Sequence, residues 1–179
     1  MTIRSYQGTE PDIHPDAYVD PAATVIGEVT IEADASVWPN VVLRGDHGAI
    51  RLREGANVQD NSVVHEGADI GRYATVGHTA IVHGCEVGER ALVGMGSIVL
   101  DDCVVGEQAM VGANALVTEG TEISDYAVAM GTPAEVVREG GEGESPWAFA
   151  ADVYTDLADA HATESEVLYE QWPPADDEG

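Results

Sequence analysis

Aliphatic residues recur at every sixth position along most of this chain, with two changes of phase, one after Leu43 and one after Val82. Two residues before each of them stands a second position, which holds alanine, serine, threonine or cysteine at 14 of 17 places. One large and one small inward residue per hexapeptide predict a narrow solenoid of short parallel strands, with the small residue at a corner. The aliphatic series is Val25, Ile31, Val37, Leu43, Leu52, Val58, Val64, Ile70, Val76, Val82, Val87, Val93, Val99, Val105, Val111, Val117 and Ile123.

Three hexapeptides complete one triangular coil, so residues 18 apart stack one strand spacing above one another, about 4.8 Å. The pattern resembles the hexapeptide-repeat superfamily, and the resemblance implies a left-handed parallel β-helix. We therefore expect an all-β solenoid with an α-helix packed on its flank. The expected parts are a β-helix domain over residues 1–138, a Gly/Glu linker over 139–144, a helical segment over 145–171 and an acidic tail over 172–179.

A helix is predicted after the linker because Ser145 and Pro146 suit the N-cap and the first turn of a helix. Residues 163–171 are interpreted as a further short helix. Apolar residues at helical spacing are expected to pack on the solenoid, namely Ala150, Val153, Tyr154, Leu157 and Ala158.

The charge balance excludes several classes of partner. Seven Lys+Arg, all of them arginine, stand against 33 Asp+Glu, which gives a net charge of −26. Nucleic-acid sites and anionic membranes both require clustered cations, so neither is an expected partner. The composition resembles that of proteins from salt-loving archaea, where counterions screen the repulsion between carboxylates.

The chain shows no signal peptide and no apolar run of the roughly 20 residues that cross a bilayer, so a cytoplasmic location is predicted. Cys85 and Cys103 fill the same small inward position in successive coils. This predicts packing in the core and leaves a disulfide geometrically open.

Three histidines fall within a short stretch and suggest a metal site. His65 and His83 each follow an aliphatic position and are one full coil apart, so they are expected to stack on one face, within reach of one ion. His78 occupies another place in its hexapeptide. A symmetric trimer would bring it beside the other two histidines of a neighbouring subunit. The competing interpretation is three solvated surface histidines.

The motifs around these histidines resemble the γ-class carbonic anhydrases. The matching residues are Arg44-Gly45-Asp46, Asn57-Val58-Gln59-Asp60, His65, His78 and His83, within roughly residues 10–138. The resemblance implies a homotrimer whose metal, Zn²⁺ with Fe²⁺ or Co²⁺ as alternatives, is held by the three histidines across an interface.

The same resemblance implies a reaction. A metal-bound hydroxide would hydrate CO2 to bicarbonate, because a divalent metal ion held by three neutral imidazoles lowers the pKa of its bound water to about 7. Gln59 and Asn57 are the expected catalytic residues at that water. The interface ion network is expected to consist of Arg44, Asp46 and Asp60, and Asp60 lies one coil before His78, where it can orient the ring.

One departure from the family concerns proton transfer. His78 follows His65 with no inserted loop between them, so the acidic loop that relays protons in some family members is missing. His47 and Glu66 are the predicted replacements.

Two other functions fit the same fold. One is a CoA-dependent acyltransferase or thioesterase, which usually needs one catalytic histidine and a CoA groove between subunits. The other is a catalytically weak trimeric scaffold.

Overall fold

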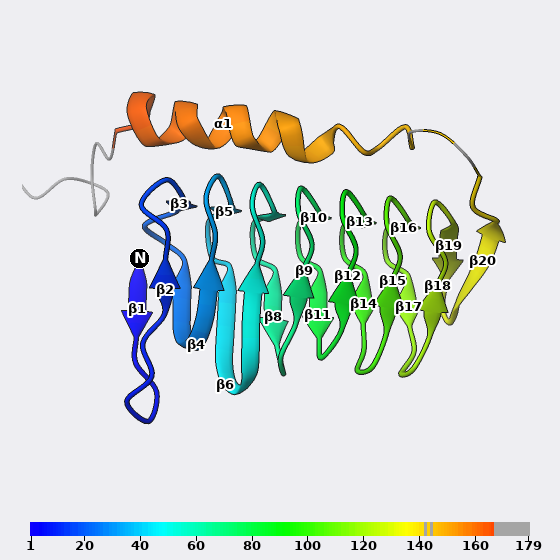
Figure 1. The fold of residues 1–179 in the computed structure, drawn as a ribbon, viewed down its shortest axis with the longest axis horizontal. Helices are drawn as coiled ribbons and strands as arrows, with labels where there is room; N and C mark the ends of the chain where they lie inside the picture. Colours follow the sequence, from blue (N-terminus) through cyan, green and yellow to red (C-terminus); the bar gives the residue numbers. More distant parts are fainter. Residues whose placement is uncertain (142, 144, 167–179) are drawn as a thin grey trace, which may run out of the picture.

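The computed structural model describes residues 1–141, 143 and 145–166, and its main body is a β-solenoid (Figure 1). One 12-stranded sheet contains β1 (Thr2–Arg4), β2 (Asp12–Ile13), β4 (Thr24–Ile31), β6 (Val42–Leu52), β8 (Val63–His65), β9 (Asp69–Ile70), β11 (Ile81–His83), β12 (Glu86–Val87), β14 (Ile98–Val99), β15 (Val104–Val105), β17 (Leu116–Val117) and β18 (Glu122–Ile123). One 8-stranded sheet contains β3 (Tyr18–Val19), β5 (Ser36–Val37), β7 (Asn57–Val58), β10 (Thr75–Val76), β13 (Leu92–Val93), β16 (Met110–Val111), β19 (Val128–Gly131) and β20 (Ala134–Arg138).

The aliphatic positions of the sequence pattern form the core, as predicted. None of them is more than 2% exposed. Small residues such as Ala56, Ala74 and Ala80 are fully buried beside them. Parallel pairing places residues 18 apart in register, for example Val58 with Val76 and Val64 with Val82. Each coil therefore buries the same kinds of side chain as the coil before it, and the left-handed parallel β-helix is confirmed.

The two changes of phase have different structural causes. At the first, Gly27 pairs with Gly45 but Val29 pairs with Ile50, so β6 carries extra residues that bulge between these pairs. At the second, the shortened hexapeptide turns through Gly84, whose φ of 57° lies in the left-handed region that favours glycine. Both irregularities lie beside the predicted histidine site.

The solenoid has three faces because β4 and β6 run around one corner and join two walls of the larger sheet. The apolar face carries outward side chains from β4, β6, β8, β11, β14 and β17, namely Thr24, Val42, Val63, Ile81, Ile98 and Leu116. The charged face carries Thr30, Arg51, Asp69, Glu86, Val104 and Glu122. The helix face, made by the smaller sheet, packs against the C-terminal helix near β3, β5 and β7.

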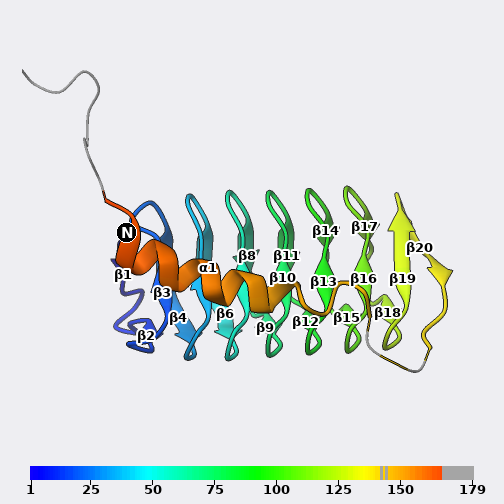
Figure 2. The same ribbon diagram turned by 90° about the horizontal axis from the view of Figure 1, so that it is seen from above.

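Helix α1 (Ala150–Glu164) runs back along the helix face (Figure 2). Ala151 and Ala158 are its buried residues and Tyr154 packs against the core, whereas the predicted contacts Val153 and Leu157 are 53% and 40% exposed. The small side chains of Ala151 and Ala158 let the helix lie close to the sheet. The larger aliphatic side chains of Val153 and Leu157 then stay exposed beside the contact.

The prediction that Ser145 caps this helix was wrong. The helix begins at Ala150, and the Ser145 hydroxyl donates to the backbone oxygen of Gln108 (3.0 Å), so it fixes the chain to the solenoid instead. Ser165 and Glu166 are not helical, and α1 ends at Glu164. The remainder of the predicted second helix and the acidic tail lies outside the described residues.

Both ends of the solenoid carry strands that the hexapeptide pattern did not predict. β1 pairs with β4 in parallel and extends the N-terminal end. β20 turns back to pair with β19 in an antiparallel hairpin, which covers the C-terminal edge of the smaller sheet. Within the part of the chain that the structure describes, no helix is long and apolar enough to cross a membrane.

Salt is expected to stabilise this fold. A net charge of −26 on one short chain produces self-repulsion in the compact state. Raising KCl from about 0.1 M to about 1 M shortens the Debye length from ~10 Å to ~3 Å, so the midpoint of thermal unfolding should rise. Circular dichroism at each salt concentration checks this, and a midpoint that stays constant or falls contradicts it.

Candidate functional site

Strand register builds a histidine ladder at one edge of the apolar face. Arg44 on β6 pairs with His65 on β8, and His65 pairs with His83 on β11. Nδ1 of His65 lies 3.2 Å from Nε2 of His83. The structure thus brings together the two histidines that the repeat spacing placed on one face.

A carboxylate holds the opposite nitrogen of each ring. His83 donates from Nδ1 to Asp101 (2.6 Å), and His65 donates from Nε2 to Asp46 (3.0 Å). In neutral rings these bonds leave lone pairs on His83 Nε2 and on His65 Nδ1, the two atoms that face each other. No hydrogen then lies between these two nitrogens, so the pair suits a cation, and the Arg44 guanidinium already faces its His65 side.

The donor geometry fits a metal ion. Two nitrogen ligands about 2.0–2.1 Å from a tetrahedral ion lie ~3.3 Å apart, close to the separation of the two facing nitrogens. Carboxylates on the far nitrogens are the usual outer partners of metal-binding histidines. Arg44 also donates from Nη2 to His65 Nδ1 (3.2 Å), and this contact would have to yield to an ion.

His78 lies apart from this pair in the single chain. It follows β10, donates from Nδ1 to Asp60 (2.8 Å), and has Nε2 3.4 Å from the hydroxyl of Tyr154 on α1. Asp60 therefore contacts the ring that the sequence spacing assigned to it. Within one subunit the three histidines are not together. The trimer prediction requires this separation, because it takes the third histidine from a neighbouring subunit.

The predicted ion network is divided between two places. Arg44 donates to Asp46 (2.9 Å), whereas Asp60 pairs with His78 instead. Desolvation acts to raise the pKa of Asp46, but hydrogen bonds from His65 and Arg44, together with the Arg44 charge, outweigh it and hold this pKa below its ordinary value. Asp46 therefore remains an acceptor that fixes both neighbours.

The two predicted catalytic amides lie in the other sheet. Asn57 on β7 is fully buried and donates to Thr75 Oγ1 (2.9 Å). Gln59 is 5% exposed and donates to Asn57 Oδ1 (3.2 Å). The bond from Asn57 to Thr75 joins successive coils, whereas the bond from Gln59 to Asn57 lies within one coil.

His47 and Glu66 meet beside the histidine pair. His47 donates from Nδ1 to Glu66 Oε1 (3.1 Å), and the same carboxylate oxygen lies 3.7 Å from His65 Nε2. His47 belongs to the bulge of β6, which carries it to the edge of the next coil. The two residues predicted to relay protons are therefore in contact with each other.

Two residues of this site were missed from the sequence. Asp101 lies 18 residues after His83, but the coil there is one residue shorter, since Val82 pairs with Val99, so the repeat spacing alone would not have identified it. Gly84 allows this contact, because a Cβ there would meet the Asp101 carboxylate. Tyr154 also had no signal in the sequence, since only the packing of α1 brings it to His78.

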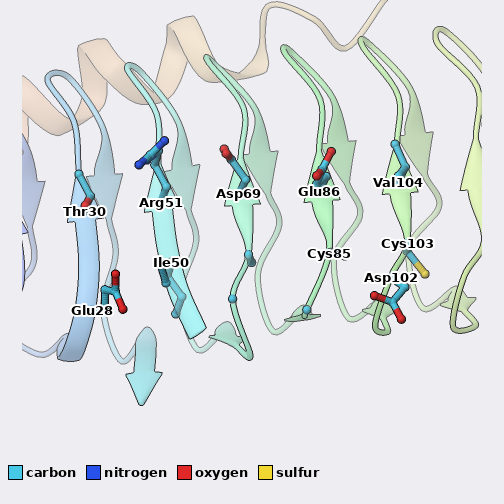
Figure 3. A pocket seen from close by; sticks show the side chains of 14 residues that line it. Glu28, Thr30, Ile50, Arg51, Asp69, Cys85, Glu86, Asp102, Cys103 and Val104 are labelled. Atoms are coloured by element: carbon cyan, nitrogen blue, oxygen red, sulfur yellow. The ribbon is translucent and has the colours of Figure 1, made fainter. Parts of the chain in front are cut away.

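A separate groove of about 530 Å³ crosses the charged face (Figure 3). Outward side chains from successive coils line it, among them Arg51, Asp69 and Glu86. Cys85 and Cys103 also border it but are buried free thiols, and burial raises the pKa of Cys85 to about 12. The cysteines thus pack in the core, and the disulfide left open by the sequence is not formed.

Comparisons with known proteins place this architecture in a family. Residues 84–119 match the bacterial transferase hexapeptide family (six repeats). The chain is 38% identical over 151 residues to the carnitine operon protein CaiE of Escherichia coli O1:K1, covering 82% of this chain and 77% of CaiE.

Two solved structures are also similar to this chain. A hexapeptide transferase family protein from Anaplasma phagocytophilum is 38% identical with a TM-score of 0.86, covering 89% of this chain and 98% of that protein. A putative acetyltransferase from Bacillus cereus is 32% identical with a TM-score of 0.80, covering 88% and 92%.

These relatives overturn the prediction of a γ-class carbonic anhydrase. Hydration of CO2, the lyase class and a CO2 or bicarbonate substrate were wrong, because the similar proteins are named as CaiE and as transferases. The physical reason is that stacked histidines follow from the solenoid register, and a fold does not determine the reaction. These bacterial relatives also give no support to a haloarchaeal origin or to zinc in particular.

The coverage of both chains, the sequence identity and the shared solenoid lead to one conclusion: this protein belongs to the hexapeptide-repeat transferase family and is related to CaiE.

Proposed function

We propose that this protein transfers an acyl group from a CoA thioester to a nucleophilic acceptor. The observation that supports this most directly is the similarity over nearly the whole chain to the putative acetyltransferase of Bacillus cereus and to the hexapeptide transferase family protein of Anaplasma phagocytophilum. CoA thioesters are the ordinary donors of such reactions. The acceptor is an amine, a hydroxyl or water, and water would make the reaction a thioester hydrolysis.

The proposed reaction centre is the histidine pair with His47 beside it. His47 donates to Glu66 from Nδ1, so its Nε2 is free to take a proton, and its side chain is 65% exposed. The acceptor loses its proton to His47 and bonds to the thioester carbonyl carbon. The carbon–sulfur bond then breaks, and the departing CoA sulfur takes the proton back from His47.

A divalent metal ion at the histidine pair is part of this proposal. His65 and His83 are the residues of this chain that would hold it, and His78 of a neighbouring subunit is the predicted third histidine. The ion would supply Lewis acidity toward the thioester carbonyl. Asp46 and Asp101 would keep the metal-facing nitrogens unprotonated.

We further propose that the chain forms a homotrimer through the apolar face. Homotrimers are typical of hexapeptide-repeat proteins. The aliphatic residues Val42, Val63, Ile81 and Ile98 form a continuous outward row on this face, although the molecule has a large net charge. Such a row beside the histidine pair is suited to a self-complementary contact that also brings in His78.

The proposed reaction is tested by supplying acyl-CoA esters of increasing chain length to protein reconstituted with Zn²⁺, Fe²⁺ or Co²⁺. Free CoA is measured with a thiol reagent and the acylated acceptor by mass spectrometry, with amines, alcohols and water as acceptors. We expect CoA release above the uncatalysed rate for at least one donor. If no donor is consumed in any metal state, the proposed activity is wrong.

A further inference from the structure

Large apolar side chains lie exposed around His78. Met95 follows β13 and occupies the position of His78 in the next coil, because β10 and β13 pair in register. Val153 and Leu157 belong to α1. These three side chains, which we call the His78 patch, are 56%, 53% and 40% exposed. In a chain with a net charge of −26, a group of exposed apolar side chains marks a surface for a ligand or a partner.

Contacts on its two sides fix how α1 is turned. Asp152 accepts hydrogen bonds from Arg90 (2.9 and 3.2 Å) on one side of the helix. On the other side, the Tyr154 hydroxyl lies 3.4 Å from His78 Nε2. A helix turns by about 100° per residue, so the two patch residues of α1 fall on the same side of the buried alanines as Tyr154. The α1 part of the patch therefore borders the edge of the solenoid that carries His78.

The patch also lies level with His78 along the solenoid. Met95 is one coil further on, about 4.8 Å away along the axis. Leu157 follows Tyr154 by three residues, a rise of ~4.5 Å along the helix. Because α1 runs back along the solenoid, Leu157 lies toward the earlier coils and Met95 toward the later ones (Figure 2). The imidazole of His78 is thus flanked by apolar side chains in both directions.

The proposed trimer gives this patch a place at the reaction centre. His78 faces the histidine pair of a neighbouring subunit there, so the patch borders the same centre. His65 of that pair contacts Asp46 and Glu66 of its own chain. Carboxylates are poor partners for aliphatic side chains, because a contact between them removes the hydration of the charge. The substrate is therefore a more suitable occupant of the patch than the neighbouring subunit.

The acyl chain is the apolar part of a CoA thioester. The phosphates of CoA are anionic and suit cations, whereas an alkyl chain gains free energy from each methylene that leaves water. The acyl chain starts at the carbonyl carbon, the atom that is attacked at the reaction centre. We propose that the His78 patch binds the acyl chain of the donor, so that the protein prefers aliphatic acyl groups longer than acetyl. This inference rests on the proposed acyl transfer and on the site shared with His78.

The test compares donors of increasing chain length, from acetyl-CoA to octanoyl-CoA, in the wild type and two double variants. Val153→Ser/Leu157→Ser removes the α1 part of the patch. Val136→Ser/Val137→Ser is the matched control, since these residues are 43% and 61% exposed on β20. The ratio of kcat/KM for octanoyl-CoA to that for acetyl-CoA is measured for each protein. S-octyl-CoA, a thioether that cannot transfer its chain, gives a dissociation constant by calorimetry without turnover.

We expect kcat/KM of the wild type to rise about 4-fold for each methylene that contacts the patch. The α1 double variant should lower the octanoyl to acetyl ratio at least ~10-fold and weaken the binding of S-octyl-CoA, whereas the β20 double variant should keep the wild-type values. An unchanged ratio in the α1 variant, or an equal loss in the β20 variant, overturns this inference while acyl transfer stands. Binding of S-octyl-CoA that depends on the patch, without turnover of any donor, supports the patch and overturns the proposed reaction.

Mass and circular dichroism keep the result interpretable. Val153 and Leu157 lie outside the hydrophobic core of the described chain, so the α1 double variant should keep the wild-type spectrum. If its mass in analytical ultracentrifugation falls to that of one chain, the patch is covered by a second copy and the acyl-chain inference is wrong.

Discussion

Replacing Ile81 with aspartate is expected to convert the proposed homotrimer into single chains. Ile81 lies in the middle of the outward aliphatic row, with Val63 and Ile98 as its register partners on either side. Burying an isoleucine side chain contributes about 1.5–3 kcal/mol, and an unpaired carboxylate in its place adds a desolvation penalty. The change recurs at each of the three interfaces of a trimer, so the equilibrium should shift by several orders of magnitude.

Analytical ultracentrifugation checks this result. The mass should fall from that of three chains to the 18.8 kDa of one chain. Val104→Asp is the matched control, because Val104 is 38% exposed and Ile81 is 37% exposed, but Val104 lies on the charged face. An Ile81→Asp protein that keeps the full mass, or an equal loss in the control, would show that the apolar face is not the interface.

Replacing His83 with alanine is expected to lower thioester turnover by roughly 10²-fold or more, because a bound metal ion contributes several kcal/mol of transition-state stabilisation. His83 is the central member of the site, because its Nε2 faces His65 and its Nδ1 is held by Asp101. Alanine removes one of the two facing nitrogens, so bound metal should be lost together with activity.

The rate of CoA release and the metal content are measured on the same preparations. His14→Ala is the control, since the His14 side chain is exposed and accepts a hydrogen bond from the backbone of its neighbour Asp16. Wild-type turnover in His83→Ala would show that the reaction centre does not include this histidine pair. A similar loss in His14→Ala would show that the effect is not specific to the site.

Repeat spacing was a strong guide where backbone pairing alone determines position. Parallel strands in register place each residue above its counterpart in the previous coil, so the contacts of His65 with His83 and of Asp60 with His78 could be predicted. Asp101 was missed because the shortened hexapeptide after Val82 shifts the register, so this residue stands one position beyond the counterpart of His83.

Motif resemblance was a poor guide to the reaction, because stacked histidines, an arginine and carboxylates are features of the scaffold that different reactions share. Asn57 also matches one of these motifs. The structure buries it with a hydrogen bond to Thr75, and its catalytic role stays a prediction.

The hexapeptide period was sufficient to predict the solenoid, its core and the stacking of His65 on His83, because it repeats the same inward and outward choice in every coil. Contacts between irregular segments and distant elements became visible only in the folded chain. The bulge of β6 carries His47 to Glu66, and α1 brings Tyr154 to His78. These contacts depend on how an irregular loop and a distant helix pack, and local periodicity contains no information about either.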